Sequence, residues 1–367
     1  MSLFLLGVVS IVVIGFVVYL FKFKNQIKGY HLTNENVTGT YQDLFAQDTK
    51  DTHDKRKNAG WDVAGKYYDM VTDFYLYGWG RSFHFAPRHK KESMIESIQR
   101  HEYWLAKQMD LKKGMKCLDL GCGVMGPATN ISRFTGAHIT GVNNHPYQSQ
   151  QAKEYISQMG LSEQCQIVRG DFNNLDDNSD LPSESYDAAY TIEASCHAKD
   201  RPHCYKQIYN KLKPGAIFAG YEWVMISGKY DSKNEEHNKI KFDIMKGDGL
   251  PEILMDKEID ESLRKAGFEV IKTEDVGVTD QIHPVPWYQP IDNGGWDFTS
   301  WFQTSYGRFI VHKLVGILES VGLVPKSSQQ AYEFLMAGAS GLVAGGKTGI
   351  FTPCYFFMAR KPLTAAE

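Results

Sequence analysis

A strand, a tight turn and a helix are predicted within one stretch, Lys116-Cys-Leu-Asp-Leu-Gly-Cys-Gly-Val-Met-Gly-Pro127. Its apolar start predicts a buried strand, and the residues that follow it can begin a helix. Gly121, Gly123 and Gly126 lie between them with the spacing G-x-G-x-x-G. Such glycines let the backbone approach a ligand, and the helix N-terminus attracts polar or charged groups. The stretch therefore predicts an α/β sheet with a ligand site at its edge.

The residue that narrows the ligand class is Asp119, two positions before the first glycine. Its carboxylate would repel a pyrophosphate but would attract an ammonium or sulfonium group. Leu118–Gly123 therefore resembles the S-adenosylmethionine (AdoMet) loop of class I methyltransferases. That resemblance implies a Rossmann-like α/β fold, with a seven-stranded sheet and helices on both faces.

The pattern beyond this loop predicts the alternating strands and helices of a doubly wound α/β domain. Strands are expected at 115–121, 138–143, 165–171, 186–193, 215–223, 268–275 and 352–360. Helices are expected at 93–109, 126–134, 146–159, 203–212 and 256–266. The predicted segments are an anchor (1–24), a polar linker or solvated helix (25–60), an aromatic substrate segment (61–110), an AdoMet-binding core (111–275), a substrate-covering insertion (276–351) and a final strand with a tail (352–367).

The anchor is predicted from residues 3–21, which are 19 residues without a charge. As a helix they would be about 28 Å long, close to the thickness of a bilayer's hydrocarbon core. A cleaved signal peptide would need basic residues before this run and small residues at a cleavage site, and the sequence has neither. Lys22, Lys24 and Lys28 follow the run, so the positive-inside rule predicts a single-pass anchor with a cytosolic body.

Charge and cysteine content limit the other partners. A net charge of −3 gives no reason to expect nucleic acid binding. The 6 cysteines are scattered, with no CxxC pair and no histidine cluster at zinc spacing. Reduced thiols and no metal site are therefore expected.

Two segments are candidates for the walls of a substrate cavity. Residues 61–85 carry 9 aromatic side chains, interleaved with Asp69, Asp73 and His84. This segment is either plain core or a cavity wall. Residues 276–351 are too long for a loop and are expected to form a lid or second wall, with helices near 309–322 and 329–343.

Ligand groups in a fold of this kind come from the carboxyl ends of the strands. The first four predicted strands end in Asp119, Gly121 and Gly123; Asn143 and Asn144; Asp171 and Phe172; and Glu193 and His197. The first seven of these are expected to bind the cofactor, although NAD enzymes carry an acid where Asn143 stands. Glu193 and His197 either face the cleft or are satisfied at the end of their strand.

One further motif, Gly341–Thr348, has the letters of a Walker A phosphate loop. A true phosphate loop follows a strand and opens a helix. This motif follows a helical pattern and precedes a strand, so nucleotide binding is not expected there.

Six blocks of the chain resemble signature blocks of the sterol 24-C-methyltransferases: Phe74–Phe85, Leu118–Pro127, Ile192–Ala198, Tyr221–Val224, Gly247–Pro251 and Gly341–Lys347. The similarity extends from about Trp61 to Pro362. Two residues depart from the family pattern. Leu76 stands where the family usually has an acid, and Met125 stands where it usually has glycine.

The resemblance implies an enzyme of the endoplasmic reticulum membrane, monomeric or homo-oligomeric. It would transfer the AdoMet methyl group to carbon 24 of a sterol side-chain alkene through a carbocation, giving a 24-methylene sterol. The residues expected at the substrate are Tyr75, Tyr77, Trp79, Phe83, Phe85, Glu222 and Trp223. The rings of the first five can stabilise a cation. Tyr75 and Trp79 are expected to act in catalysis, and the candidates for the final base are Glu193, His197, His84 and Asp73.

Other interpretations share part of this pattern. A fatty-acyl or phosphobase methyltransferase would share the glycine loop but lack the C-terminal blocks. A NAD(P) oxidoreductase would carry an acid or an arginine where Asn143 stands. A membrane tether without enzymatic activity would not need a cleft of acids and aromatic rings.

Overall fold

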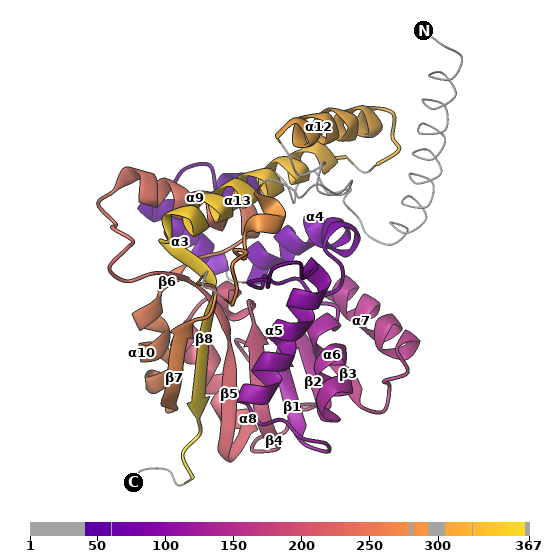
Figure 1. The fold of residues 1–367 in the computed structure, drawn as a ribbon, viewed down its shortest axis with the longest axis vertical. Helices are drawn as coiled ribbons and strands as arrows, with labels where there is room; N and C mark the ends of the chain where they lie inside the picture. The colour runs from indigo at the N-terminus through magenta and orange to yellow at the C-terminus, as the bar shows by residue number, and fades with distance from the viewer. Residues whose placement is uncertain (1–40, 60, 279–281, 293–304, 325, 364–367) are drawn as a thin grey trace.

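One mixed β-sheet is the centre of the computed structural model, which describes residues 41–59, 61–278, 282–292, 305–324 and 326–363 (Figure 1). The strands are β1 (Lys116–Leu120), β2 (His138–Asn143), β3 (Cys165–Arg169), β4 (Tyr186–Ile192), β5 (Leu212–Met225), β6 (Leu254–Met255), β7 (Glu269–Asp275) and β8 (Phe351–Arg360). Their order is β3-β2-β1-β4-β5-β8-β7, and β6 pairs with β5 outside this path. β8 is antiparallel to β5 and β7, and the other pairs are parallel.

The predicted α/β fold is confirmed, but the prediction of seven strands is wrong. The sheet has 8 strands, and the additional one, β6, contains 2 residues. A strand this short has no alternation of polar and apolar residues that a sequence could reveal. β5 also begins at Leu212 rather than 215, because Leu212 already pairs with Tyr186 before a shift in register.

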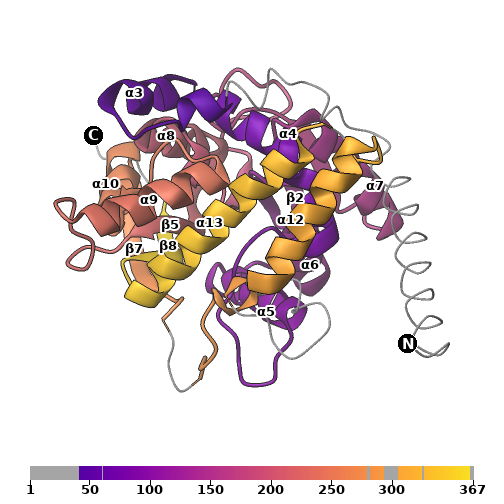
Figure 2. The same cartoon turned by 90° about the horizontal axis from the view of Figure 1, so that it is seen from above.

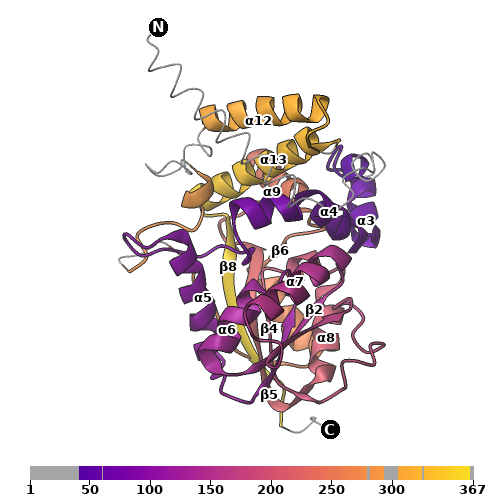
Figure 3. The same cartoon turned by 90° about the vertical axis from the view of Figure 1, so that its right-hand side faces the viewer.

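Helices cover both faces of the sheet (Figure 3). One face carries α5 (Met94–Gln108), α6 (Gly126–Thr135) and α7 (Pro146–Gln158), and the other carries α8 (Arg201–Lys211) and α10 (Asp256–Ala266). Each face has its own apolar core. Leu105 and Ile156 are buried in the first core, and Ile208 and Leu263 are buried in the second.

A third group of helices, called the cap here, lies above the carboxyl ends of the parallel strands (Figures 1 and 2). It consists of α3 (Lys50–Ala59), α4 (Trp61–Gly78), α9 (Glu235–Asp248), α12 (Ser305–Ser320) and α13 (Ser328–Thr348). Two short 3-10 helices lie nearby, η1 (Ser195–His197) and η2 (Gln289–Ile291). The cap has a separate apolar core that includes Val71, Ile244 and Phe334.

The segment predicted to be a polar linker or a solvated helix contains α3, but some side chains of its described part, residues 41–59, are buried. Tyr41 and Phe45 are buried in the cap core, and Arg56 of α3 is also buried. The Arg56 guanidinium donates to the carbonyl of Leu44 at 3.0 Å and to the carboxylate of Asp48 at 2.7 Å. The segment is highly charged on average, so its sequence did not indicate the few buried side chains that pack it into the cap.

The predicted membrane anchor over residues 3–21 lies outside the described residues. Within the part of the chain that the structure describes, no helix has the length and apolar character needed to cross a membrane.

The 6 cysteines are all free and buried, so the structure forms no disulfide between them. Over the same described ranges, no group of 3 or more histidine, cysteine or acidic side chains is arranged to hold a metal ion.

Candidate active site

The glycine loop between β1 and α6 has the backbone geometry that its sequence predicts. Gly121 and Gly123 have φ angles of +73° and +52°, which residues with a Cβ rarely adopt. A Cβ on Gly121 would also lie 2.4 Å from the Cβ of Ala194. The loop therefore keeps open a concave surface that a larger side chain would fill.

Met125, which replaces a glycine of the family pattern, has a φ angle of +67°. This left-handed conformation explains why glycine suits the position. The Met125 side chain is fully buried, and its Sδ lies where a Cβ on Gly141 would come within 2.3 Å. Methionine at this position strains the backbone locally, but the Met125 side chain packs in the core and not in the ligand pocket.

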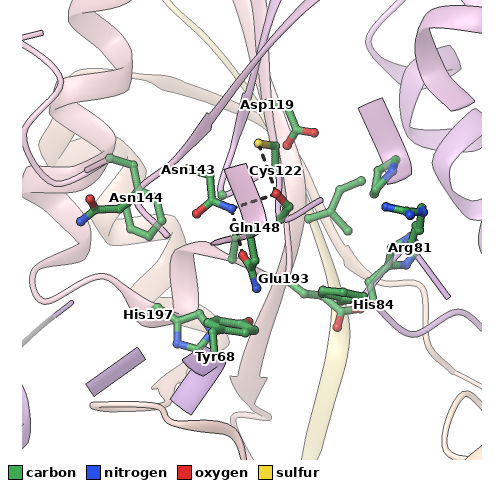
Figure 4. Close-up of a pocket in the computed structure, with 17 residues that line it drawn as sticks. Tyr68, Arg81, His84, Asp119, Cys122, Asn143, Asn144, Gln148, Glu193 and His197 are labelled. Carbon is green, nitrogen blue, oxygen red and sulfur yellow. Dashed lines mark hydrogen bonds between the residues drawn. The ribbon is translucent and has the colours of Figure 1, made fainter. Parts of the chain in front are cut away.

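A polar pocket opens beside this loop at the ends of β1, β2 and β4 (Figure 4). The predicted cofactor residues that line it are Asp119, Gly121, Gly123, Asn143, Asn144 and Phe172. The Asp119 carboxylate is buried and accepts a hydrogen bond from the Tyr190 hydroxyl at 3.0 Å. Burial raises the pKa of Asp119 to about 7, although the bond from Tyr190 opposes the rise. A cationic ligand group would restore its ionised form, so the pocket fits the ammonium or sulfonium of AdoMet.

Arg81 also lines this pocket, and the sequence analysis missed it. Its Nη1 is buried and has no hydrogen-bond partner among the described residues. An unpaired guanidinium nitrogen in a pocket fits a carboxylate, such as the one in the amino-acid part of AdoMet. Only tertiary contact brings Arg81 here, because a Cβ on Gly126 would lie 2.1 Å from the Arg81 carbonyl oxygen.

Asn143 lines the pocket, but its side-chain amide is already hydrogen-bonded to other groups of the protein. Its Nδ2 donates to the carbonyl of Gly123 at 2.8 Å and to Oε1 of Gln148 at 2.9 Å, and its Oδ1 accepts from the amide of His145 at 2.9 Å. Asn143 therefore fixes the glycine loop to the end of β2, as Figure 4 shows. The amide of Asn144 lies beside it in the pocket lining.

Asp171 is not among the residues that line the pocket. Its Oδ1 accepts hydrogen bonds from the backbone amide and the side-chain Nδ2 of Asn173, both at 2.8 Å. The carboxylate thus stabilises its own turn, and Phe172 lines the pocket instead.

A second space, called the aromatic cavity here, adjoins the polar pocket beneath α13. It is lined by the predicted residues Tyr75, Trp79, Phe83, Phe85 and Trp223, and by Leu335, Met336 and Leu342 of α13. The ring centroids of Tyr75 and Phe83 are 5.2 Å apart, and those of Trp79 and Phe85 are 5.1 Å apart. The aromatic segment is therefore a cavity wall as well as part of the cap core.

The polar pocket and the aromatic cavity share one wall. The residues that line both spaces are Tyr68, Phe83, His84, Glu193 and His197. A ligand in the pocket and a ligand in the cavity would therefore meet at these side chains.

Glu193 is held firmly in this shared wall. It has a φ angle of +52° at the end of β4, a strained conformation that often marks functional sites. Its Oε1 accepts from the Phe85 amide and its Oε2 from the Trp223 indole, both at 2.8 Å. Burial raises the pKa of Glu193 to about 8, and the nearby charge of His84 opposes this rise.

His84 faces a hydrogen-bond acceptor at each ring nitrogen. Nδ1 lies 2.9 Å from the carbonyl oxygen of Phe85, and Nε2 lies 3.1 Å from the carboxylate of Glu102. Glu102, which the sequence analysis missed, also accepts hydrogen bonds from Ser82 and Asn130. Burial lowers the pKa of His84, but the bond to Glu102 and its charge outweigh burial and raise the pKa overall. With a proton on each nitrogen to match these two acceptors, His84 would have no lone pair with which to accept another proton.

His197 has the opposite character. Burial lowers its pKa to about 4, so the ring is neutral near pH 7. Its Nδ1 lies 3.3 Å from the carbonyl oxygen of Gly249 and donates to it, which leaves Nε2 to accept from the Tyr68 hydroxyl at 3.1 Å. Tyr68, a third residue missed from the sequence, lies next to His197 in Figure 4.

Asp73 and Glu222, two of the predicted site residues, lie away from both spaces. Asp73 is five residues after Tyr68 on α4, about 140° around the helix axis, and it accepts from the Tyr147 hydroxyl at 2.6 Å. Glu222 is fully buried and binds Ser195 and Tyr205.

Three other sequence features are placed as follows. The Tyr77 side chain lies outside the described part of the structure. Leu76, half-buried on α4, lines neither the pocket nor the cavity. The Walker-like motif at 341–348 forms the last turns of α13, so its backbone amides belong to a helix and not to a loop.

Comparison with known families supports the same chemistry. Residues 298–363 match the family model described as sterol methyltransferase C-terminal, and residues 118–220 match a methyltransferase domain. The chain is 48% identical over 309 residues to the cycloartenol-C-24-methyltransferase of Arabidopsis thaliana, covering 84% of this chain and 90% of that protein. It is 43% identical over 324 residues to the sterol 24-C-methyltransferase of Saccharomyces cerevisiae, covering 86% of this chain and 82% of that one.

Solved structures share the fold at much lower sequence identity. The cyclopropane synthase MmaA2 from Mycobacterium tuberculosis has a TM-score of 0.62 at 13% identity, covering 82% of this chain and 98% of that one. The [4+2]-cyclase SpnF has a TM-score of 0.58 at 21% identity, covering 82% and 96%. The class I methyltransferase fold is thus common to proteins with different reactions.

Proposed function

Because this chain belongs to the sterol 24-C-methyltransferase family, we propose that its polar pocket and aromatic cavity hold the methyl donor and the sterol side chain against each other. The chain transfers a methyl group from AdoMet to carbon 24 of a sterol. The observation that supports the arrangement is the wall shared by the two spaces. When bound, AdoMet supplies an electrophilic methyl group: the C24=C25 electron pair of the sterol forms the new bond, and sulfur keeps the pair of the broken one.

The polar pocket binds the amino-acid part of AdoMet through two opposite charges. Asp119 faces its ammonium group, and Arg81 faces its carboxylate. Asn143 acts on neither, but holds the glycine loop in shape through its bond to Gly123. A buried carboxyl and a buried, unpaired guanidinium nitrogen support this assignment, since a zwitterion would pair with both.

The aromatic cavity stabilises the positive charge that methyl transfer leaves on the sterol. Each desolvated ring contributes about 0.5 to 2 kcal/mol by cation–π interaction, and Tyr75 and Trp79 are the rings proposed for it. A cation in the cavity favours ionisation of Glu193, whose pKa burial raises to about 8, and the carboxylate then adds an opposite charge at the shared wall. Its two bonds to N–H donors keep it oriented and favour its ionised form.

The final proton goes to Tyr68, which passes its own proton to His197. The Tyr68 hydroxyl lies in the shared wall and points at the unprotonated Nε2 of His197. A hydrogen next to a carbocation is strongly acidic, so a weakly basic pair is sufficient. Loss of a proton from the transferred methyl carbon gives the 24-methylene product.

One incubation tests the proposal. Purified protein is supplied with AdoMet carrying a deuterated methyl group and a panel of sterols with and without a C24=C25 double bond. We expect label only in sterols that have the double bond, as a 24-methylene group that retains two deuterium atoms. Label in fatty acids or in phosphoethanolamine, supplied in parallel, would instead favour a fatty-acyl or phosphobase methyltransferase.

A single-pass anchor in residues 1–24, with the catalytic domain on the cytosolic side of the endoplasmic reticulum, is also part of the proposal. The uncharged run at 3–21 and the lysines after it support the anchor. The cap adds a second apolar surface: Phe309 and Ile317 of α12 and Val321, directly after the helix, are 56%, 59% and 62% exposed. Such a stripe suits contact with a lipid surface.

Deletion of residues 1–24 distinguishes the two membrane contacts. The truncated protein should leave the membrane fraction after carbonate washing and still methylate a detergent-dispersed sterol. If it remains in that fraction, Phe309→Ser with Ile317→Ser in the truncated chain should release it, and Ile95→Ser, at a residue of α5 that is 65% exposed, is the matched control. Retention of all these variants would contradict both contacts.

A further inference from the structure

We propose that the carboxyl group of Asp248 is the counter-charge for the carbocation that forms at carbon 25 of the sterol side chain. The inference rests on the proposed function and adds a residue to it. Asp248 lines the aromatic cavity but not the polar pocket. Its side chain is buried, and Oδ2 has no hydrogen-bond partner among the residues described. An unpaired buried carboxyl oxygen is costly to a fold, so a bound ligand is its natural partner.

The packing of two helices places this carboxyl group. α9 ends at Asp248, and Gly249 follows with a φ angle of +65°. Gly247 touches α13, since a Cβ there would lie 2.0 Å from the Cα of Gly338. A Cβ on Gly338 would lie 2.9 Å from Oδ2 of Asp248. The close contact of the two glycines therefore places the Asp248 carboxyl group beside α13, which lines the cavity.

The electrostatic surroundings of Asp248 favour a positively charged ligand. Burial raises its pKa well above the ordinary range, and the charge of Glu193 raises it further. A positive charge inside the cavity would reverse this balance, because an opposite charge favours the ionised carboxylate. Two buried carboxyl groups facing one apolar cavity thus match a substrate that becomes a cation during the reaction.

The order of bond changes separates the role of Asp248 from that of the final base. Methyl capture by C24 leaves C25 with the positive charge, one bond farther from the methyl donor. A hydride then moves with its electron pair from C24 to C25, and the charge moves to C24. A proton finally leaves the new methyl carbon, and its C–H pair becomes the double bond.

Asp248 and the shared wall therefore serve different atoms. The base must be near the transferred methyl group, which places it in the shared wall with Tyr68 and His197. Asp248 lines the cavity but not the pocket, at the part of the cavity where C25 and its two methyl groups would lie. If Asp248 were itself the base, it would take a proton from one of those methyl groups and leave the double bond at C25.

Binding of two sterol probes tests the inference in Asp248→Asn. One probe carries a protonated amine in place of C25, and the other is a saturated sterol of the same shape without charge. We expect the variant to bind the charged probe at least about tenfold more weakly, as for loss of a charge-assisted contact, and the neutral probe within about twofold of wild type. Asp243→Asn is the matched control, because Asp243 lies on the same helix and pairs with Lys239 at the surface.

Two results would overturn the assignment: an unchanged preference for the charged probe, or an equal loss of both probes. Asparagine has the shape of aspartate, and burial already disfavours the charged carboxylate in the empty cavity. The neutral Asp248→Asn variant is therefore expected to fold. The variant should also divert part of the product to sterols in which the cation has captured water, leaving a hydroxyl group, or has lost a different proton, leaving the double bond elsewhere. A wild-type protein that methylates no sterol would refute the proposed function, whereas full methylation with unchanged probe preference in Asp248→Asn refutes this inference alone.

Discussion

The polar pocket and the aromatic cavity are neighbours, yet they are built in different ways. The pocket gathers most of its groups from strand ends of the sheet, and the acidic and basic side chains that line it without lining the cavity are Asp119 and Arg81. The cavity is assembled between the cap and the sheet from α4, η1, α9 and α13, which are far apart in the chain. Its charges are carboxyl groups enclosed among rings. One space is suited to a stable zwitterion, and the other to a charge that exists only during the reaction.

The difference teaches that affinity for the methyl donor and the fate of the cation can be changed separately. Groups that touch a ligand only in the pocket should alter AdoMet binding. Groups that line only the cavity should alter rate and product. Glu193 lines both spaces, so a substitution there is the strictest test of whether AdoMet binding and the fate of the cation can be changed separately.

The largest expected effect is on the pocket side. Asp119→Ala should weaken AdoMet binding by about 1 to 3 kcal/mol, because a charge-assisted contact is lost. Arg81→Met should weaken it by a comparable amount. Titration calorimetry measures both, and Asp171→Asn is the control, since that carboxylate bonds within its own turn. If Asp119→Ala binds AdoMet as tightly as the control, Asp119 is not a cofactor residue.

The shared wall should give the next largest effect. Glu193→Gln should reduce kcat at least about tenfold, or about 1.4 kcal/mol, because glutamine cannot ionise in response to the cation at the shared wall. AdoMet affinity should change less than kcat does. Steady-state rates together with calorimetry separate the two. A normal rate in this variant would remove Glu193 from the chemistry and leave Tyr68 and His197 as the groups that act there.

Glu193 also makes stability depend on pH. Its pKa is about 8 in the folded protein, and the ordinary value is 4.5. Between these two pH values the folded state therefore holds a proton that the unfolded state has released. The stabilisation is complete below about pH 4.5 and is lost as the pH rises through about 8. Glu193→Gln should therefore gain stability relative to wild type between pH 5 and pH 9 in urea unfolding, by more than about 1 kcal/mol. A pH-independent difference would mean that Glu193 is not buried as described.

A smaller effect is expected from the cavity wall alone. Trp79→Leu keeps apolar bulk but removes the ring, so kcat should fall about 2- to 30-fold, corresponding to about 0.5 to 2 kcal/mol. AdoMet affinity should stay within about twofold, and part of the product should carry the double bond elsewhere. Phe134→Leu, at an exposed ring on α6, is the control. A single normal product at a normal rate would mean that Trp79 only fills the core.

The smallest effect is expected outside both spaces. Lys347→Ala, in the Walker-like motif, should change the free energy of unfolding by less than about 0.5 kcal/mol, because its pair with Asp292 is on the surface. Neither wild type nor variant should retain labelled ATP in equilibrium dialysis. Saturable ATP binding that the substitution abolishes would show that the motif binds a nucleotide despite its helical backbone.

Residues at strand ends were the part of the site that could be read from the sequence. Asp119, Glu193 and His197 follow apolar runs of strand length, and parallel strands end at one edge of a sheet. Their backbone positions were therefore fixed by local pattern. Asp171 follows the same rule but does not line the pocket, because its carboxylate accepts from donors of the turn that it begins.

The sequence by itself determined the α/β fold, the glycine loop and the resemblance to one enzyme family, because these depend on spacings of a few residues. Only the tertiary structure decided which side chains share a wall and which protons they hold. Tyr68, Arg81, Glu102 and Asp248 enter the site through contacts between helices and loops that the sequence separates widely. Burial and partner choice then set their charges, and both are properties of the packed molecule rather than of any single segment.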